Sequence, residues 1–185
     1  YNVPLKLRTK SERDEILEAI FALYPTKTIE LDFETPFQLL TAVMLSAQMT
    51  DKGVNKATKK LFEIVKTPAD LLKLEPEKVE VMLRGVNYYR VKTKHLFQTA
   101  VKLVHEHGGK IPQTLETIRT LPGVGVKTAK VVLSHLYDMP FIGVDTHIHR
   151  VMNRMGIVKT KTPEETDKKL EKLLSEDQKR TMHHA

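Results

Sequence analysis

Hydrophobic residues recur at intervals of three and four along almost the whole chain, which is the spacing of one face of an α-helix. Extended, alternating patterns are nearly absent: only residues 27–33 (KTIELDF) alternate weakly, and they are interpreted as an extended loop. An all-α protein is therefore expected. The predicted helices lie at residues 11–24, 37–47, 51–65, 76–84, 91–107, 114–120, 126–136, 146–156 and 163–174. A short helix is also predicted to start at residues 67–68, and one more begins in the tail.

Capping residues mark the expected start of the first helix. Ser11 and Asp14 have the spacing of a capping box, in which each side chain accepts a hydrogen bond from the backbone of the other residue. The first helix is therefore predicted to begin directly after Ser11.

The most informative stretch is residues 121–150, LPGVGVKTAKVVLSHLYDMPFIGVDTHIHR. Helical spacing before Leu121 is interrupted by Pro122, Gly123 and Gly125 and then resumes as far as Leu136. This pattern predicts a helix-hairpin-helix. Glycine leaves the amides of the turn uncovered, and a helix N-terminus carries a partial positive charge. Such a turn is suited to binding a phosphate group.

Two polar residues stand at helix entrances in this stretch. Lys127 lies in the first turn after the glycines, where the helix dipole and any burial would both favour the neutral, nucleophilic amine. Asp145 precedes Thr146 in the position of an N-cap, which leaves one carboxylate oxygen for chemistry. Together they would supply an amine that attacks an electrophilic carbon and a carboxylate that assists it.

Two other glycine motifs do not match this stretch. A P-loop requires a glycine where Val126 stands, and the dinucleotide-binding pattern requires one where Thr128 stands. Taken singly, Lys127 is more often a solvated surface charge and Asp145 more often only a helix cap. Their joint occurrence around a Gly-x-Gly turn favours the functional interpretation.

Composition narrows the class of partner. The chain has 185 residues, 41% of them hydrophobic, and no apolar run of membrane-spanning length, so a soluble globular protein with no membrane association is expected. Its formal net charge is +7 and its pI is near 9.5, which favours a polyanionic partner such as nucleic acid. No signal peptide is visible, so an intracellular location is assumed.

Metal binding is not expected from these residues. The chain has no cysteine, which excludes a disulfide, a thiolate nucleophile and a cysteine-held metal within it. His147 and His149 are two positions apart and would point to different faces of a helix. The adjacent His183 and His184 have no carboxylate near them in the sequence.

The segments LPGVGVKTA, VDTHIHRV and LLTAVMLSAQMTD closely resemble motifs of the endonuclease III family of DNA repair glycosylases, within the helix-hairpin-helix superfamily. The likeness runs from about Phe33 to the tail. It implies a two-lobed, all-α fold with a DNA-binding cleft between the lobes. A six-helix lobe would span residues 30–139 and contain the hairpin at about 114–137, and residues 1–29 and 140–185 would form the second lobe.

The resemblance also implies roles for individual residues. Lys127 matches the lysine that attacks C1′ of the damaged nucleotide and forms a Schiff base, and Asp145 matches its partner carboxylate. Gln48 matches the residue that fills the gap left by the flipped base, and Tyr88 stands where the family places a wedge. The amides expected to hold the neighbouring phosphate are those of Gly123, Val124 and Gly125.

Two departures from the family pattern qualify the resemblance. Members usually end in a loop of four cysteines that holds a 4Fe-4S iron–sulfur cluster, whereas this sequence stops at Ala185 without one; it is either truncated or naturally lacks the cluster, and no cofactor is expected in this chain. The GVNYYRVK segment is similar to the adenine-mismatch branch. That branch has a catalytic glutamate where Ala42 stands and lacks the lysine, so adenine excision is not expected.

The leading hypothesis is a bifunctional DNA glycosylase and abasic-site lyase that removes oxidised or ring-saturated pyrimidines. Damaged double-stranded DNA is the expected partner, the expected state is a monomer, and the expected location is DNA-associated, the cytoplasm or nucleoid in a prokaryote. One alternative is a glycosylase that removes thymine or uracil from mismatches. Another is a non-catalytic helix-hairpin-helix module that binds DNA through phosphates alone.

Overall fold

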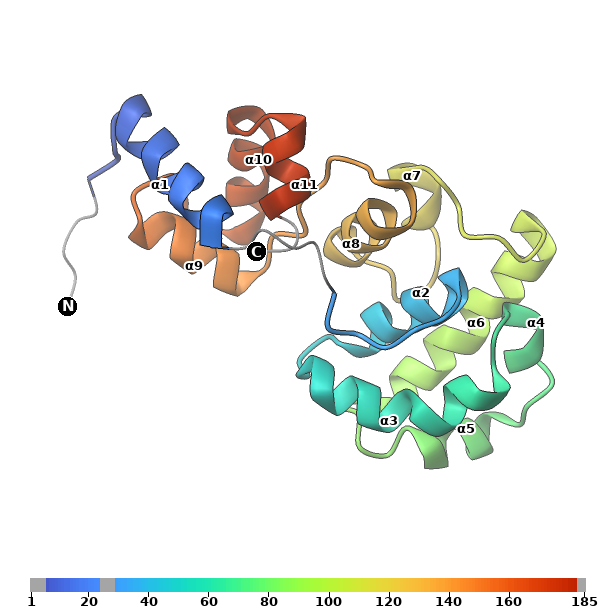
Figure 1. Ribbon diagram of the computed structural model, residues 1–185. Helices are drawn as coiled ribbons and strands as arrows, with labels where there is room; N and C mark the ends of the chain where they lie inside the picture. The colour runs from blue at the N-terminus through green and yellow to red at the C-terminus, as the bar shows by residue number, and fades with distance from the viewer. Residues whose placement is uncertain (1–5, 24–28, 183–185) are drawn as a thin grey trace. The chain divides into compact units, whose positions relative to one another are not determined.

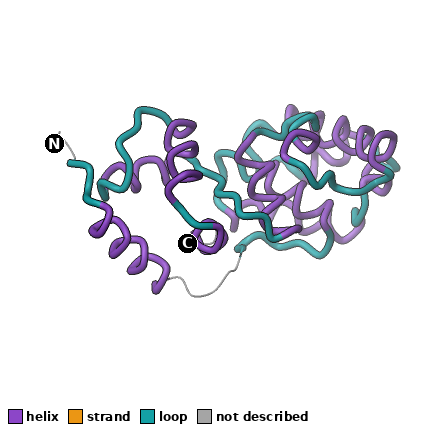
Figure 2. The backbone as a smooth tube through the Cα atoms, turned by 90° about the horizontal axis from the view of Figure 1, so that it is seen from above, coloured by secondary structure: helices purple, strands orange, loops and turns teal. Residues whose placement is uncertain are grey.

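The computed structural model describes residues 6–23 and 29–182, and these residues form helices and loops without any strand (Figures 1 and 2). The all-α prediction is confirmed for this part of the chain. The chain divides into two compact units: Glu30–Leu136, and Tyr1–Ile29 together with Tyr137–Ala185. The boundary predicted from the sequence after residue 139 lies slightly beyond the observed one.

The fully described unit of residues 30–136 contains seven helices rather than the expected six, although α4 and α7 are single turns of four residues. These helices are α2 (Pro36–Leu45), α3 (Asp51–Ile64), α4 (Pro68–Leu71), α5 (Pro76–Met82), α6 (Tyr89–His107), α7 (Leu115–Ile118) and α8 (Val126–Tyr137) (Figure 1). The hairpin predicted for residues 114–137 corresponds to α7, the turn after it and α8.

Helix α2 is the centre of this unit, because every residue from Phe37 to Leu45 is buried. A helix that is apolar on all sides is stable only when other elements surround it. Its single buried amide side chain, Gln38, is fully bonded: Nε2 donates to the carbonyls of Phe62 and Val65 at 2.9 and 2.8 Å, and Oε1 accepts from the Glu34 amide at 2.7 Å. Gln38 therefore joins α2 to the end of α3 without leaving a buried polar group unpaired.

Helix α6 is the longest helix in the unit and packs against α2, α4 and α5. Its buried face carries Leu96, Ala100 and Leu103 at helical spacing. The helix ends at Gly108, whose φ of 58° lies in the left-handed region that glycine adopts without steric penalty. Side chains of α6 also bind the turn between α7 and α8 and the backbone at the end of α2.

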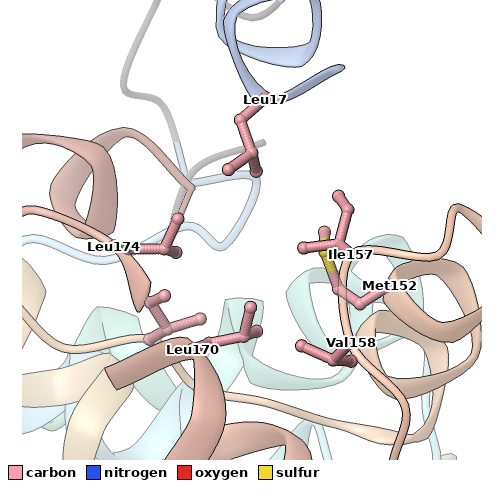
Figure 3. Close-up of a cluster of buried hydrophobic side chains, with 7 residues drawn as sticks. Leu17, Met152, Ile157, Val158, Leu170 and Leu174 are labelled. Carbon is pink, nitrogen blue, oxygen red and sulfur yellow. The ribbon is translucent and has the colours of Figure 1, made fainter. Parts of the chain in front are cut away.

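The other unit combines helices from both ends of the chain. These are α1 (Lys10–Leu23), α9 (Thr146–Arg154), α10 (Pro163–Leu173) and α11 (Glu176–Met182). Its core, shown in Figure 3, consists of Leu17, Ile142, Met152, Ile157, Val158, Leu170 and Leu174. Burial of such side chains contributes about 1.5–3 kcal/mol each. Helix α1 contributes Leu17 to this core, and its partly buried Ile16, Ile20 and Phe21 pack against it.

The predicted capping box at Ser11 and Asp14 is wrong. Helix α1 begins at Lys10, and the reciprocal bonds are made by Thr9 and Glu12: the Thr9 amide donates to the Glu12 carboxylate at 2.8 Å, and the Glu12 amide donates to Thr9 Oγ1 at 3.4 Å. Thr9 and Glu12 have the same three-residue spacing as the predicted pair, so spacing alone did not identify the correct register. The expected end of this helix, Tyr24, lies outside the described residues.

Candidate functional site

The turn between α7 and α8 is held in place by two side chains of α6. Thr99 Oγ1 donates to the carbonyl of Pro122 at 2.8 Å, and Lys102 Nζ donates to the carbonyl of Thr120 at 3.2 Å. These bonds satisfy carbonyls of a turn that lies outside the helical hydrogen-bond pattern. The hairpin is thereby fixed to the longest helix of its unit.

The two glycines of the hairpin turn have different structural roles. Gly123 has a φ of +77°, and a Cβ at this position would lie 2.9 Å from His95, so both the backbone conformation and the available space require glycine. At Gly125 φ is not positive, and a Cβ would have no atom within 4 Å. The turn itself therefore does not require glycine at position 125.

The amides of the turn are not equivalent either. The Val124 amide donates to the carbonyl of Leu121 at 3.1 Å, and the Val124 side chain is buried. In this structure the Val124 N–H closes the turn within the protein, and its contact with a phosphate stays a prediction. Among the described residues the amides of Gly123 and Gly125 donate to no acceptor, so these two groups remain available for an anion at the start of α8.

Lys127 is the second residue of α8, in the first turn, as the sequence predicted. Its side chain is exposed. The charge of Lys127 acts on Asp51 at the start of α3. Burial, reinforced by the charge of Glu30, raises the pKa of Asp51, and the nearby Lys127 opposes this shift. Asp51 is an electrostatic neighbour of Lys127 that sequence spacing did not identify.

Asp145 is the N-cap of α9, as predicted. Its backbone is extended, with φ −110° and ψ −174°, and its Oδ1 accepts from the amides of His147 and Ile148, both at 2.9 Å. The two capping bonds use the same carboxylate oxygen, and Oδ2 takes part in neither. Asp145 belongs to the unit built from the chain ends, whereas Lys127 belongs to residues 30–136.

Gln48 and Tyr88 share an unusual backbone conformation. Their φ angles are 60° and 57°, in the left-handed region that residues with a side chain rarely adopt, and both side chains are exposed. Such a conformation costs about 1–3 kcal/mol and persists where the surrounding structure enforces it. Among the described residues only Asp138 shares this feature outside glycine. Two of the three strained positions are thus residues that the sequence assigned to DNA contact.

The turns that carry Gln48 and Tyr88 are bonded to each other. Asn87 Nδ2 donates to the Gln48 carbonyl at 2.7 Å, and Lys92 Nζ donates to the carbonyls of Leu45 and Ala47, both at 2.7 Å. Partial burial lowers the pKa of Lys92. Lys92 ends the GVNYYRVK segment, and its neighbours in the sequence do not indicate this contact. A better signal was available at α2, whose last turn has no basic residue to complement its carbonyls.

The residues present do not fit a 4Fe-4S cluster. Such a cluster is held by cysteine thiolates, and this chain has no cysteine. Within residues 6–23 and 29–182 no group of three or more histidine, aspartate and glutamate side chains is arranged to hold a metal ion. In the same ranges no helix has the length and apolar character needed to cross a membrane.

The chain is similar in sequence to a known family of proteins. Residues 41–176 match the family described as "HhH-GPD superfamily base excision DNA repair protein". The chain is 42% identical to endonuclease III of Escherichia coli K12 over 175 residues, which covers 95% of this chain and 83% of the relative. It is also 42% identical to endonuclease III of Thermotoga maritima over 164 residues, which covers 89% of this chain and 76% of that protein.

Solved structures show the same fold. A trapped covalent intermediate of endonuclease III with DNA superposes with a TM-score of 0.91 at 36% identity, covering 96% of this chain and 84% of that one. A thermostable thymine-DNA glycosylase superposes with a TM-score of 0.80 at 20% identity, covering 94% and 83%, which shows a common fold alone. The family match, the identity over most of the chain and the fold establish that this protein belongs to the endonuclease III family of HhH-GPD base excision repair proteins and is a DNA glycosylase and abasic-site lyase.

Proposed function

We propose that this protein removes oxidised or ring-saturated pyrimidines from damaged double-stranded DNA, with Lys127 as nucleophile and Asp145 as its assisting carboxylate. The observation that carries the assignment of roles is the exposed Lys127 amine in the first turn of α8, directly after a turn with two available amides. In this arrangement Gly123 and Gly125 bind the backbone phosphate beside the lesion. Their positions, four and two residues before the lysine, bring that nucleotide's sugar to the amine.

The chemistry proceeds in three steps. Lys127 Nζ forms a bond to C1′ while the C1′–N bond breaks, and the damaged base leaves with the bonding electron pair. Opening of the sugar ring gives a Schiff base between C1′ and the lysine. Removal of a proton from C2′ then expels the 3′ phosphate by β-elimination, which cuts the strand. Asp145 accepts a proton from the lysine ammonium before attack and passes it to the departing base. The carboxylate regenerated in this way stabilises the positive charge at the sugar and transfers a proton from the lysine nitrogen to O4′ as the C1′–O4′ bond opens.

Base flipping gives Gln48 and Tyr88 their roles. C1′ of a stacked nucleotide is inaccessible, so the damaged nucleotide must leave the helix, at a cost of a few kcal/mol that damage lowers. Tyr88, which is 68% exposed, acts as the wedge between stacked bases, and Gln48 fills the gap opposite the partner base. The protein acts as a monomer on DNA, in whichever compartment holds that DNA. The excess of basic residues supports this association.

The test is borohydride trapping on end-labelled duplexes that contain thymine glycol, a thymine:guanine mismatch, an abasic site or no lesion. Wild type is expected to form a covalent adduct and cut the strand with thymine glycol. Both Lys127→Ala and Lys127→Arg should lose the adduct; the arginine variant keeps the positive charge but has no nucleophilic amine, so it separates catalysis from DNA attraction.

Each other outcome contradicts a defined part of the proposal. Preference for the mismatch would replace the oxidised-pyrimidine assignment with a mismatch glycosylase. An adduct on the abasic site alone would leave a lyase without excision of this lesion. An adduct that persists in Lys127→Ala would show that another amine is the nucleophile. No adduct on any duplex, with folded protein, would leave only a DNA-binding module.

A further inference from the structure

The C-terminus of α2 is completed by side chains from a distant part of the chain. A helix ends with carbonyls that lack partners within the helix. At α2, the Ala42 and Val43 carbonyls accept locally from the Ser46 amide and hydroxyl, both at 2.9 Å. The Leu45 carbonyl in the last turn accepts from Lys92, and so does the Ala47 carbonyl just after the helix. The Gln48 carbonyl accepts from Asn87. The end of this helix thus depends on residues 39 to 47 positions later in the sequence.

The Lys92 ammonium stabilises the end of α2 and not its own helix, α6. It lies in the first turn of α6, where the helix dipole disfavours a positive charge. Its ammonium instead lies at the C-terminus of α2, where the dipole favours a cation and two carbonyls accept from it at 2.7 Å. Charge-assisted hydrogen bonds of this kind are stronger than bonds between neutral groups. Lys92 is therefore a link between the two turns.

The link connects the two strained residues. Gln48 lies just after α2, with its carbonyl bonded to Asn87, and Tyr88 follows Asn87 directly. Both adopt positive φ, so neither would hold its side chain in place without external support. A side chain that enters a base stack meets resistance from that stack, and the opposing gap filler must arrive in register with the wedge. A rigid connection between their backbones meets both requirements.

We propose that Lys92, together with Asn87, is a positioning residue that holds Gln48 and Tyr88 as one preassembled unit for insertion into the duplex. This inference rests on the proposed DNA-contact roles of those two residues. Lys92 itself contacts carbonyls of the protein, so its effect on DNA acts through the two turns. It should matter where a base stack has to be opened, and should be irrelevant where there is no stack.

The first measurement is binding to a duplex that contains a tetrahydrofuran abasic-site analogue, compared with the undamaged duplex. The analogue has no C1′ hydroxyl and forms no Schiff base, so preference for it reports insertion without chemistry. The variants are Lys92→Met and Asn87→Ala, with Lys94→Met as the control because it removes the same charge from an exposed position on α6. Lys92→Met should reduce the preference about tenfold and Asn87→Ala about threefold, while Lys94→Met should keep it within about twofold.

The second measurement compares borohydride trapping on an abasic site in a duplex and in the same strand alone. The single strand has no stack to open, so Lys92→Met should lose about tenfold on the duplex and less than about twofold on the single strand. A misfolded variant would lose both. Equal losses on the two substrates, or a tetrahydrofuran preference in Lys92→Met equal to that of Lys94→Met, would overturn the proposal.

The two measurements also separate this inference from the proposed function. Absence of any adduct in wild type would refute lysine chemistry. The binding preference for the tetrahydrofuran duplex would still test the positioning role of Lys92. Normal trapping on thymine glycol by wild type, with Lys92→Met unchanged in both assays, would refute the positioning role alone. A wild type without preference for the analogue would refute insertion by Gln48 and Tyr88, and with it this role of Lys92.

Discussion

His95 of α6 occupies the space that a side chain at Gly123 would need: a Cβ built on Gly123 would lie 2.9 Å from both Cβ and Nδ1 of His95. The conformation of the hairpin turn is thus enforced from two directions, by the positive φ of the glycine and by the histidine packed against it. No such restraint applies to Gly125, two residues later in the same turn. We therefore expect substitution of these two glycines to have different effects.

Gly123→Ala should destabilise the protein by about 1–3 kcal/mol, because the alanine is strained at positive φ and clashes with His95. Urea unfolding measures this directly. Adding His95→Ala should restore part of the loss, since it removes the clash but leaves the backbone strain. A Gly123→Ala variant as stable as wild type would contradict the strained conformation of this turn.

Gly125→Ala should leave the unfolding free energy within about 0.5 kcal/mol of wild type, since the added methyl group meets open space. DNA binding should nevertheless weaken, because the methyl group stands beside an amide that is proposed to face a phosphate. The measurement is affinity for undamaged duplex at several salt concentrations. Unchanged affinity would remove Gly125 from the proposed phosphate contacts.

Asp145 has a capping role and a proposed chemical role, and two substitutions separate them. Asparagine caps a helix about as well as aspartate, so Asp145→Asn should retain the stability of α9, whereas Asp145→Ala should cost about 1 kcal/mol. Both variants should lower strand cleavage about 10²–10⁴-fold if the carboxylate assists catalysis. Full cleavage activity in Asp145→Asn, measured with the end-labelled duplexes, would assign this residue to the cap alone.

Gln38→Leu should destabilise the protein by about 2 kcal/mol or more, because the carbonyls of Phe62 and Val65 would lose a buried donor. Leucine has a similar volume, so the loss reflects hydrogen bonding more than packing. Gln98→Leu, at an exposed position on α6, is the matched control and should change stability by less than about 0.5 kcal/mol. Equal effects in the two variants would argue against a structural role for Gln38.

Asp70 provides a pH-dependent contribution to stability. Hydrogen bonds from Lys73 and from Thr67 lower its pKa from 3.8 to about 2. Since the carboxylate is favoured in the folded state, its contribution is fully present above 3.8 and is lost as the pH falls towards 2. Urea unfolding at decreasing pH should therefore show Asp70→Asn less stable than wild type above this window, with the difference closing inside it. A constant difference would contradict the shift.

Several site features were predictable from sequence because their causes are local. The broken helical spacing at Pro122 and Gly123 indicated the hairpin, the residues after it placed Lys127 in the first turn of α8, and Thr146 after Asp145 indicated the cap. Each depends on neighbours within about one helical turn. That Lys127 and Asp145 act together is still a prediction that follows from the resemblance.

The remaining features depend on residues far apart in the sequence, and only the tertiary structure decided them. The ammonium of Lys92 completes α2 across 47 positions, and the steric need for glycine at 123 arises from His95 on another helix. Composition and periodicity do not predict such pairs, because the partner of a side chain depends on how the helices pack and not on its neighbours in the sequence. The sequence by itself therefore determined the helices, the hairpin and the type of chemistry, whereas the packing around α6 determined which groups are held and which amides are left available.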